Sequence, residues 1–430
     1  DYILFYAEGT DNWNSESQTN LNLYDTKSYY YITASGGDGK RIQNLNQPIG
    51  NISLELNTFD DYQHHEIDQT NIVHLGRQWL GESFDINQEQ EFSFSFPNLD
   101  TSIPVKIEVS AASASLTTTS FAISANGQSA GSISFPSLIA NSDTKYTTGK
   151  LPPNTQFTGA DNIKVKLIYN NNGIPGSKGY LDYINLTAKR KLLGTSKQFH
   201  FQYNAAGSTA GIVNYTIGNA SGVTQIWDVT DLYNVSKIEN ANQTSFSFKA
   251  NLGEIRKYVA IDPSDYYVPL KENQSKIANQ NLKGSIFRNN QNTFQDIDYA
   301  IITPKSLASQ AEKLASFHRT NSNLNVKVIA LENIYQEFSS GKQDIAAIRN
   351  CIRYIYNNAS SPDKRIRYVN LFGDASFDYK DRISNNTNIV PIYQSLISNT
   401  VGEASFPSDD FYGLMDSNEG VVIPSLAGID

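Results

Sequence analysis

The chain has 430 residues, which at about 150 residues per domain suggests about three domains. Its 11% aromatic content supplies packed cores and argues against a disordered chain. A net charge of −9 argues against a nucleic-acid partner, and a single cysteine excludes both an intramolecular disulfide and a zinc site of several thiolates. No apolar run approaches the roughly 18 residues needed to cross a bilayer.

The chain begins at Asp1, without an initiator Met or the basic and apolar regions of a signal peptide. We therefore expect a segment cut from a longer polypeptide. Low charge, abundant Asn, Thr and Tyr, and the near-absence of Cys and Met suggest an exported protein.

Short runs of alternating apolar residues, bounded by Gly, Asn, Pro or Asp, predict strands over the first 270 residues. The clearest run is 162–169, in which apolar side chains alternate with polar ones, including Lys164 and Lys166. Comparable runs stand at 2–6, 29–33, 91–96, 105–109, 179–184, 225–229 and 246–248.

These runs predict three all-β modules. Residues 1–84 form an N-terminal β-rich module, and regular strand spacing over 85–192 predicts a β-sandwich resembling a jelly roll. Residues 193–292 form a second β-rich module, whose polar end at 271–292 is expected to be a linker or a long surface loop.

From Asp298 onwards the pattern is that of an α/β domain. Continuous apolar runs at 299–302 and 325–329 predict buried strands, and a third strand is expected over 367–374. Ser306 and Asp344 are the expected caps of the two intervening helices. The order βαβαβ predicts a parallel sheet covered by helices over residues 293–430. The third strand ends in a carboxylate, where open α/β sheets place their sites.

Several motifs of this α/β part resemble the gingipain-type cysteine peptidases of family C25. They are 298–303 (DYAIIT), 334–341 (IYQEFSSG), 344–349 (DIAAIR), 368–374 (YVNLFGD) and 406–413 (FPSDDFYG). Motifs of the β-rich part narrow the resemblance to the PorU-type sortases of type IX secretion. These are 4–9 (LFYAEG), 62–66 (YQHHE), 76–82 (GRQWLGE) and 226–230 (IWDVT). The resemblance covers essentially the whole chain.

The resemblance implies a caspase-like fold for 293–430 and the N-terminal part of a cell-surface cysteine endopeptidase. Such a sortase removes C-terminal sorting domains from type IX secretion cargo and couples the cargo to an anionic lipopolysaccharide anchor. The implied partners are the cargo, PorV-like and PorZ-like proteins of the outer membrane and surface, and the lipopolysaccharide. The implied location is the cell surface, with outer-membrane association through partners.

The family's catalytic His and Cys lie on later strands, and no position of this sequence matches them. No catalytic residue is therefore assigned here, and the 430-residue chain alone is expected to be inactive. The chemistry requires no cofactor. A non-catalytic relative that docks cargo or secretion partners is the alternative.

Two residues with reactive side chains are expected to be structural. Cys351 lies on the apolar stripe of its helix, where a thiol is a small buried hydrophobe with a raised pKa. His318 also lies on an apolar helix face, where a packed core or interface histidine is expected.

Two further groups could bind a metal ion. Asp374, Asp378, Asp409 and Asp410 offer oxygen ligands near strand ends and are candidates for a structural Ca²⁺, which the related gingipains also bind. The alternative is that Asp374 caps a turn and the others are solvated loop acids. His64, His65, Glu66 and His74 do not have the HExxH spacing, so we expect a loop packed against Trp79 instead.

A third function, glycan binding, would use exposed aromatic side chains such as Trp13, Tyr169 or Tyr180. Most aromatic residues of a sandwich lie in its core, so we expect these to be core residues.

Overall fold

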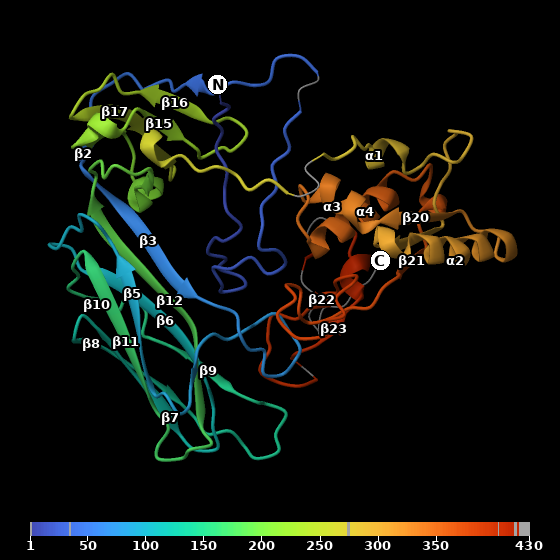
Figure 1. The fold of residues 1–430 in the computed structure, drawn as a ribbon, viewed down its shortest axis with the longest axis horizontal. Coiled ribbons are helices and arrows are strands. Elements are labelled where there is room, and N and C mark those ends of the chain that lie inside the picture. Colours follow the sequence, from blue (N-terminus) through green and yellow to red (C-terminus); the bar gives the residue numbers. More distant parts are fainter. Residues whose placement is uncertain (1, 34–35, 273–275, 403, 417–418, 421–430) are drawn as a thin grey trace.

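The structure is a computed structural model that describes residues 1–430 except 1, 34–35, 273–275, 403, 417–418 and 421–430. An elongated all-β part and a smaller α/β part lie side by side (Figure 1). The predicted combination of all-β modules followed by an α/β domain is confirmed. No helix in these described ranges is long and apolar enough to span a membrane.

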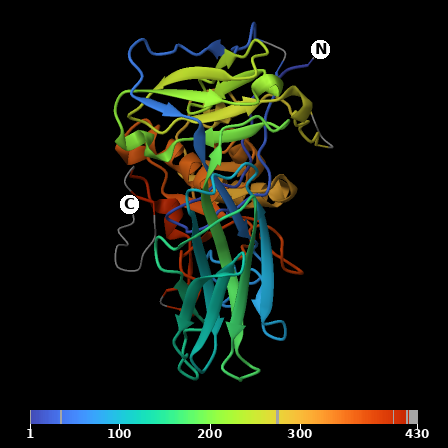
Figure 2. The same cartoon turned by 90° about the vertical axis from the view of Figure 1, so that its left-hand side faces the viewer.

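A two-sheet sandwich forms the long lower body of the β part (Figure 2). Its smaller sheet is antiparallel, in the order β5-β11-β7-β8. The strands are β5 (Glu89–Ser95), β7 (Thr119–Ala125), β8 (Gln128–Phe135) and β11 (Asn162–Asn170). The alternation predicted for β11 is confirmed, because Ile163, Val165, Leu167 and Tyr169 are buried while Lys164 and Lys166 pair with Glu91 and Glu89 on the outer face.

The larger sheet has eleven strands, in the order β1-β16-β15-β18-β13-β3-β12-β6-β10, with β4 on β12 and β9 on β6. Its strands are β1 (Gln43–Asn44), β3 (Thr58–Glu66), β4 (Ser83–Phe84), β6 (Val105–Ala114), β9 (Thr147–Lys150), β10 (Gln156–Phe157), β12 (Lys178–Lys191), β13 (Phe199–Gln202), β15 (Gln225–Asp228), β16 (Ser236–Glu239) and β18 (Lys257–Ile261). Hydrogen bonds of this sheet cross the expected module boundaries at 84/85 and 192/193, and the division into modules stays a prediction.

A second β layer covers the other end of the large sheet. It is the three-stranded sheet β17-β14-β2, built from β2 (Leu54–Leu56), β14 (Ile212–Ile217) and β17 (Phe246–Asn251). Phe201 and Tyr258 of the large sheet stack face to face at 5.2 Å within the shared core. Short 3-10 turns complete this end: η1 (Asn204–Ser208), η2 (Ala220–Gly222) and η3 (Pro263–Asp265).

The α/β part has a parallel sheet in the order β20-β19-β21, as predicted. The strands are β19 (Tyr299–Thr303), β20 (Val326–Ala330) and β21 (Tyr368–Leu371). Helix α2 (Ala308–Asn321) packs on one face against Tyr299 and Ile301. Helices α3 (Leu331–Phe338) and α4 (Ile345–Asn357) cover the other face.

Short elements complete the α/β part: α1 (Leu282–Ser285), η4 (Lys305–Leu307), η5 (Pro362–Lys364), η6 (Asp410–Gly413) and the antiparallel pair β22 (Tyr393–Gln394) and β23 (Pro407–Ser408). Asp344 caps α4 as predicted, accepting a 2.8 Å hydrogen bond from the Ala346 amide. The cap predicted at Ser306 is wrong, because Ser306 lies inside the η4 turn and α2 begins two residues later.

The strands expected at 2–6 and 29–33 are also wrong, because within the described residues no strand forms at either run. In place of a sheet edge, ring packing holds Phe5 against Tyr30 at 5.6 Å. Residues 10–26, drawn in dark blue, run between the β part and the α/β part (Figure 1). Their bonds to both parts make this segment a bridge.

Candidate functional site

The carboxyl ends of the parallel strands form the first candidate site. Thr303, at the end of β19, is fully buried and its Oγ1 donates a 2.9 Å hydrogen bond to the carbonyl of Phe372, just after β21. The carbonyl of Asp374 accepts from the amides of Ile389 and Val390, both at 2.9 Å. A Cβ at Gly373 would approach both of these side chains to 2.7 Å. The segment after β21 is therefore held firmly at the edge where α/β folds place their sites.

A shallow pocket lies beside β21. It is lined by Val369, Asn370, Leu371, Asp409, Tyr412 and Gly413. Burial raises the pKa of Asp409, and the adjacent Asp410 raises it further. Among the strands of the described chain, β21 pairs with β19.

The four candidate calcium ligands have different environments. The fully buried Asp378 carboxylate accepts from the backbone amides of Lys380, Arg382 and Ile383. Asp374 accepts from the amide of Ala375, whereas Asp409 and Asp410 flank the start of η6. Within the described ranges, no group of three or more His, Cys, Asp or Glu residues could hold a metal ion. Calcium binding by these acids stays a prediction.

Cys351 lies on the buried side of α4, as expected. It is fully buried, and desolvation raises the pKa of its thiol to about 12. A thiol in this state is not an activated nucleophile. His318 is half-buried, as expected for a packed histidine: its ring lies edge-on to Tyr299 at 5.3 Å, and its Nδ1 lies 3.1 Å from Ser322 Oγ.

The loop expected around His64 is wrong, because residues 64–66 belong to strand β3. His65 Nε2 lies 2.7 Å from Glu82 Oε1, and its ring packs against Phe92 at 4.6 Å. Trp79 instead stacks on Phe377 at 5.6 Å. His74 also stacks on Phe377, at 5.2 Å.

The proposed sugar-binding aromatics are mostly core residues. Tyr169 is 1% exposed and shares a 2.8 Å hydrogen bond with Ser113. Tyr180 is buried, and Trp13 packs edge-on against Tyr183 at 5.2 Å. No open aromatic platform for a sugar ring results from these three side chains.

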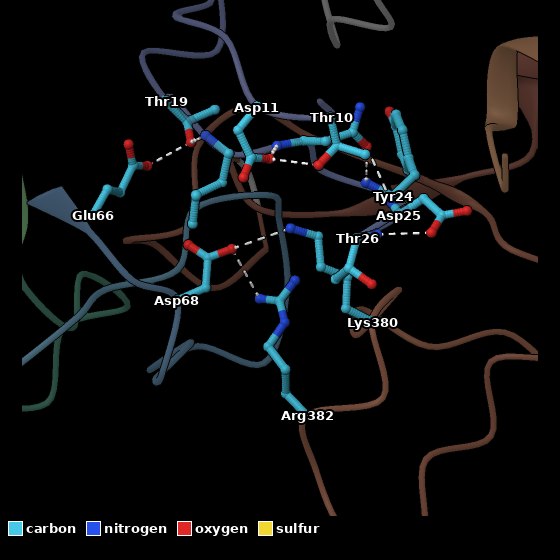
Figure 3. A network of polar contacts seen from close by, with 12 residues as sticks. Thr10, Asp11, Thr19, Tyr24, Asp25, Thr26, Glu66, Asp68, Lys380 and Arg382 are labelled. Carbon is cyan, nitrogen blue, oxygen red and sulfur yellow. Dashed lines mark hydrogen bonds and ion pairs between the residues drawn. The ribbon is translucent and has the colours of Figure 1, made fainter. Parts of the chain in front are cut away.

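A polar network lies between the β part and the α/β part (Figure 3). It was not predicted from the sequence. Asp68, beyond β3, lies 3.3 Å from Arg382 Nη1 and 3.9 Å from Lys380 Nζ of the α/β part. The Arg382 guanidinium also lies over the Trp79 ring at 3.9 Å. These partners are about 300 residues apart, so no local spacing pattern could reveal them.

Residues 10–26 complete this network. Glu66 accepts hydrogen bonds from the Asn20 amide at 2.7 Å, from Asn20 Nδ2 at 2.8 Å and from Thr19 Oγ1 at 2.5 Å. Farther along the segment, the Asp25 carboxylate accepts from the Gln343 amide at 3.0 Å, and the Tyr24 ring packs on Tyr379 at 4.9 Å. The segment therefore contacts the sandwich at one end and the α/β part at the other.

Comparison with known proteins agrees with this arrangement. Residues 292–427 match the family model of peptidase family C25. The fold of 96% of the chain matches dimeric latent PorU from Porphyromonas gingivalis, with a TM-score of 0.80 and 21% identity. The matched region spans 40% of that PorU chain. A search of curated proteins found no match.

Part of the chain also matches two carbohydrate-binding modules. One is CBM36 in complex with calcium and xylotriose, with a TM-score of 0.18, 17% identity and coverage of 29% of this chain and 98% of the module. The other is TmCBM61 in complex with β-1,4-galactotriose, with a TM-score of 0.19, 13% identity and coverage of 30% and 85%. TM-scores this low carry no functional argument.

Proposed function

From the C25 peptidase segment at residues 292–427, we propose that the protein acts as a PorU-like cysteine peptidase and sortase. The match to the C25 family model carries this proposal, and the similarity in fold to PorU over 96% of the chain supports it. The reaction would be acyl transfer: a cysteine thiolate attacks the scissile carbonyl, and water or an amine accepts the acyl group. The nucleophile would lie outside residues 1–430, because Cys351 is buried with a raised pKa.

The finer activity follows from the PorU likeness as part of the same proposal. The substrate would be exported cargo with a C-terminal sorting domain, and the acceptor an anionic lipopolysaccharide anchor. PorV-like and PorZ-like proteins of the outer membrane and surface would hold the enzyme at the cell surface. The pocket beside β21 that Asp409 and Tyr412 line would contribute to the peptide-facing side of the catalytic domain.

The test uses the native protein purified from its source. It is labelled with a thiol-directed covalent probe, and the labelled cysteines are mapped by mass spectrometry. We expect one labelled cysteine outside residues 1–430, with labelling that abolishes removal of a cargo sorting domain. If the protein carries no such cysteine but binds cargo or secretion partners, the peptidase proposal is wrong and the protein is a non-catalytic docking protein.

Replacing Cys351 by Ala is expected to leave the peptidase activity of the complete protein unchanged. The buried thiol cannot reach a substrate, and the small side chain limits the loss of stability to about 1 kcal/mol. Activity is measured on a cargo protein, with far-UV circular dichroism confirming the fold. Loss of activity in a folded C351A protein would contradict this assignment. The isolated 430-residue chain is expected to be inactive in the same assay.

A further inference from the structure

One part of the contact between the β part and the α/β part consists of hydrogen bonds on both sides of the loop 395–401. The Arg77 amide donates to the Ser395 carbonyl at 2.9 Å, and the Gln78 amide donates to Ser398 Oγ at 2.8 Å. A second contact joins the Lys145 amide to the Asn399 carbonyl at 2.8 Å and the Val401 amide to the Asp143 carbonyl at 3.0 Å. Residues 395–401 are therefore held between two segments of the β part.

A buried carboxyl group lies directly behind this contact. Asp182 is 7% exposed and occupies the irregularity in the pairing of β12 with β6, between Leu181 and Tyr183. Its Oδ2 accepts from Ser110 Oγ at 2.7 Å and from Gln78 Nε2 at 3.4 Å. Because the backbone of Gln78 is bonded to Ser398, one residue connects the carboxyl group to the α/β part.

Neighbouring carboxylates have partners that Asp182 does not. Asp68 has Arg382 and Lys380, and Glu66 accepts three hydrogen bonds from Thr19 and Asn20. Among the described residues no cation forms an ion pair with Asp182. The Lys150 ammonium, on β9, donates to Gln18 at 2.6 Å instead.

The charged and titratable groups around Asp182 come from several elements. Glu66 at the end of β3 and Asp68 beyond it oppose its negative charge, and Lys150 favours it. For the phenols of Tyr146 and Tyr183, burial and then the charge of Asp182 raise the pKa. Burial is the largest effect and raises the pKa of Asp182 to about 7, whereas the Ser110 hydrogen bond lowers it. A carboxyl group in such a site changes its charge near neutral pH.

We propose that Asp182 is a proton-operated switch of the contact between the β part and the α/β part. When protonated, it is a neutral group that fits its cation-free site and leaves Gln78 in position for Ser398. When ionised, it carries an unpaired charge behind residues 76–80, and admission of water there favours release of residues 395–401.

The direction of the effect follows from proton linkage. Release of residues 395–401 opens the site to water, so the pKa of Asp182 falls towards its ordinary value of about 4. The closed contact then binds the proton more tightly than the open one. Closing therefore weakens as the pH rises through this window and becomes independent of pH above about 7.

Hydrogen exchange of the complete chain tests the proposal, with rates corrected for the intrinsic pH dependence of exchange. The reporters are the amides of Arg77, Gln78, Lys145 and Val401, and the Tyr169 amide, bonded to the Gln88 carbonyl, is the reference. Between pH 5.5 and 7 we expect the protection of the four reporters to fall by up to about ten-fold per pH unit. The reference should stay constant.

D182N is expected to remove this pH dependence, because the amide is neutral throughout. The E66Q protein, which loses the neighbouring buried carboxyl group, should keep a slope that ends at a lower pH, because Glu66 raises the pKa of Asp182. Should D182N disturb folding, S110A provides a second variant: loss of the Ser110 hydrogen bond raises the pKa and moves the end of the slope to higher pH. A slope that persists in D182N, disappears in E66Q, or stays in place in S110A would overturn the proposal.

Discussion

The structural role of each buried or partly buried carboxylate in this protein depends on the groups that surround it. Asp378 is enclosed by backbone amides, Asp68 faces cations, and Asp344 caps a helix. Of these roles, only the cap could be predicted, because capping depends on residues two or three positions away. The burial of Cys351 was predictable for the same reason, since it follows from the spacing of apolar residues along α4.

Replacing Asp344 by Ala is expected to lower the free energy of unfolding by about 1 kcal/mol, because the Ala346 amide loses its acceptor. Urea unfolding followed by circular dichroism at 222 nm measures the change. D344N keeps an acceptor oxygen and should lie within a few tenths of a kcal/mol of the original. Equal losses in the two variants would show that the cap does not stabilise α4.

At the scale of elements, the segment that follows β3 is shaped by its contact with the α/β part. Gly76 has φ +75°, and a Cβ there would lie 2.3 Å from the carbonyl oxygen of Ile397 and from Ser398 Oγ. Gly127, in the turn between β7 and β8, has nearly the same φ of +77°, with nothing within 4 Å. A substitution at Gly127 therefore tests backbone strain alone, whereas a substitution at Gly76 tests backbone strain together with steric overlap.

Replacing Gly127 by Ala should lower the free energy of unfolding by about 1 kcal/mol, because a residue with a Cβ is strained in the left-handed backbone conformation. Replacing Gly76 by Ala should cost about 2 kcal/mol or more, because the added methyl group also displaces the backbone of Ile397. Urea unfolding gives both values. Only G76A should also speed hydrogen exchange of the Arg77 and Val401 amides. Equal exchange rates in G76A and G127A would show that steric contact with Ile397 is not the reason why position 76 requires glycine.

Most of the elements could be predicted from local patterns, and the exceptions have a common cause. The apolar runs at 162–169 and 299–302 each find a neighbouring strand and form β11 and β19. The apolar runs at 2–6 and 29–33 belong to no strand of the described chain. Pairing depends on which sheet edges are free in the folded molecule, and a single run does not contain that information. The Asp68 and Asp182 sites were missed for the same reason, since their partners lie far away in the sequence.

At the scale of the whole molecule, charged and aromatic side chains hold the two parts together. Arg382 is the centre of this contact, because it faces Asp68 at 3.3 Å and Asp378 at 3.4 Å and lies over Trp79. Burial raises the pKa of Asp68, whereas Arg382 and Lys380 lower it. Removing the guanidinium would therefore leave the Asp68 carboxyl buried with its principal cation missing.

We expect R382M to lower the free energy of unfolding by about 2 kcal/mol, since a partly buried charge loses its partner. The double variant D68N/R382M should lose less than the sum of the two single changes, because it leaves no unpaired carboxylate at position 68. Urea unfolding of the original protein, D68N, R382M and D68N/R382M completes the cycle. Additive losses would show that Asp68 and Arg382 stabilise the contact independently.

The bridging course of residues 10–26 has a consequence for how the molecule folds. The contact between Asp25 and Gln343 joins residues 318 positions apart, whereas the hairpin of β7 and β8 closes through its immediate neighbours. Contacts of such long separation form slowly, after the local ones have collapsed. We therefore expect the sandwich and the α/β sheet to form before residues 10–26 take their place between them.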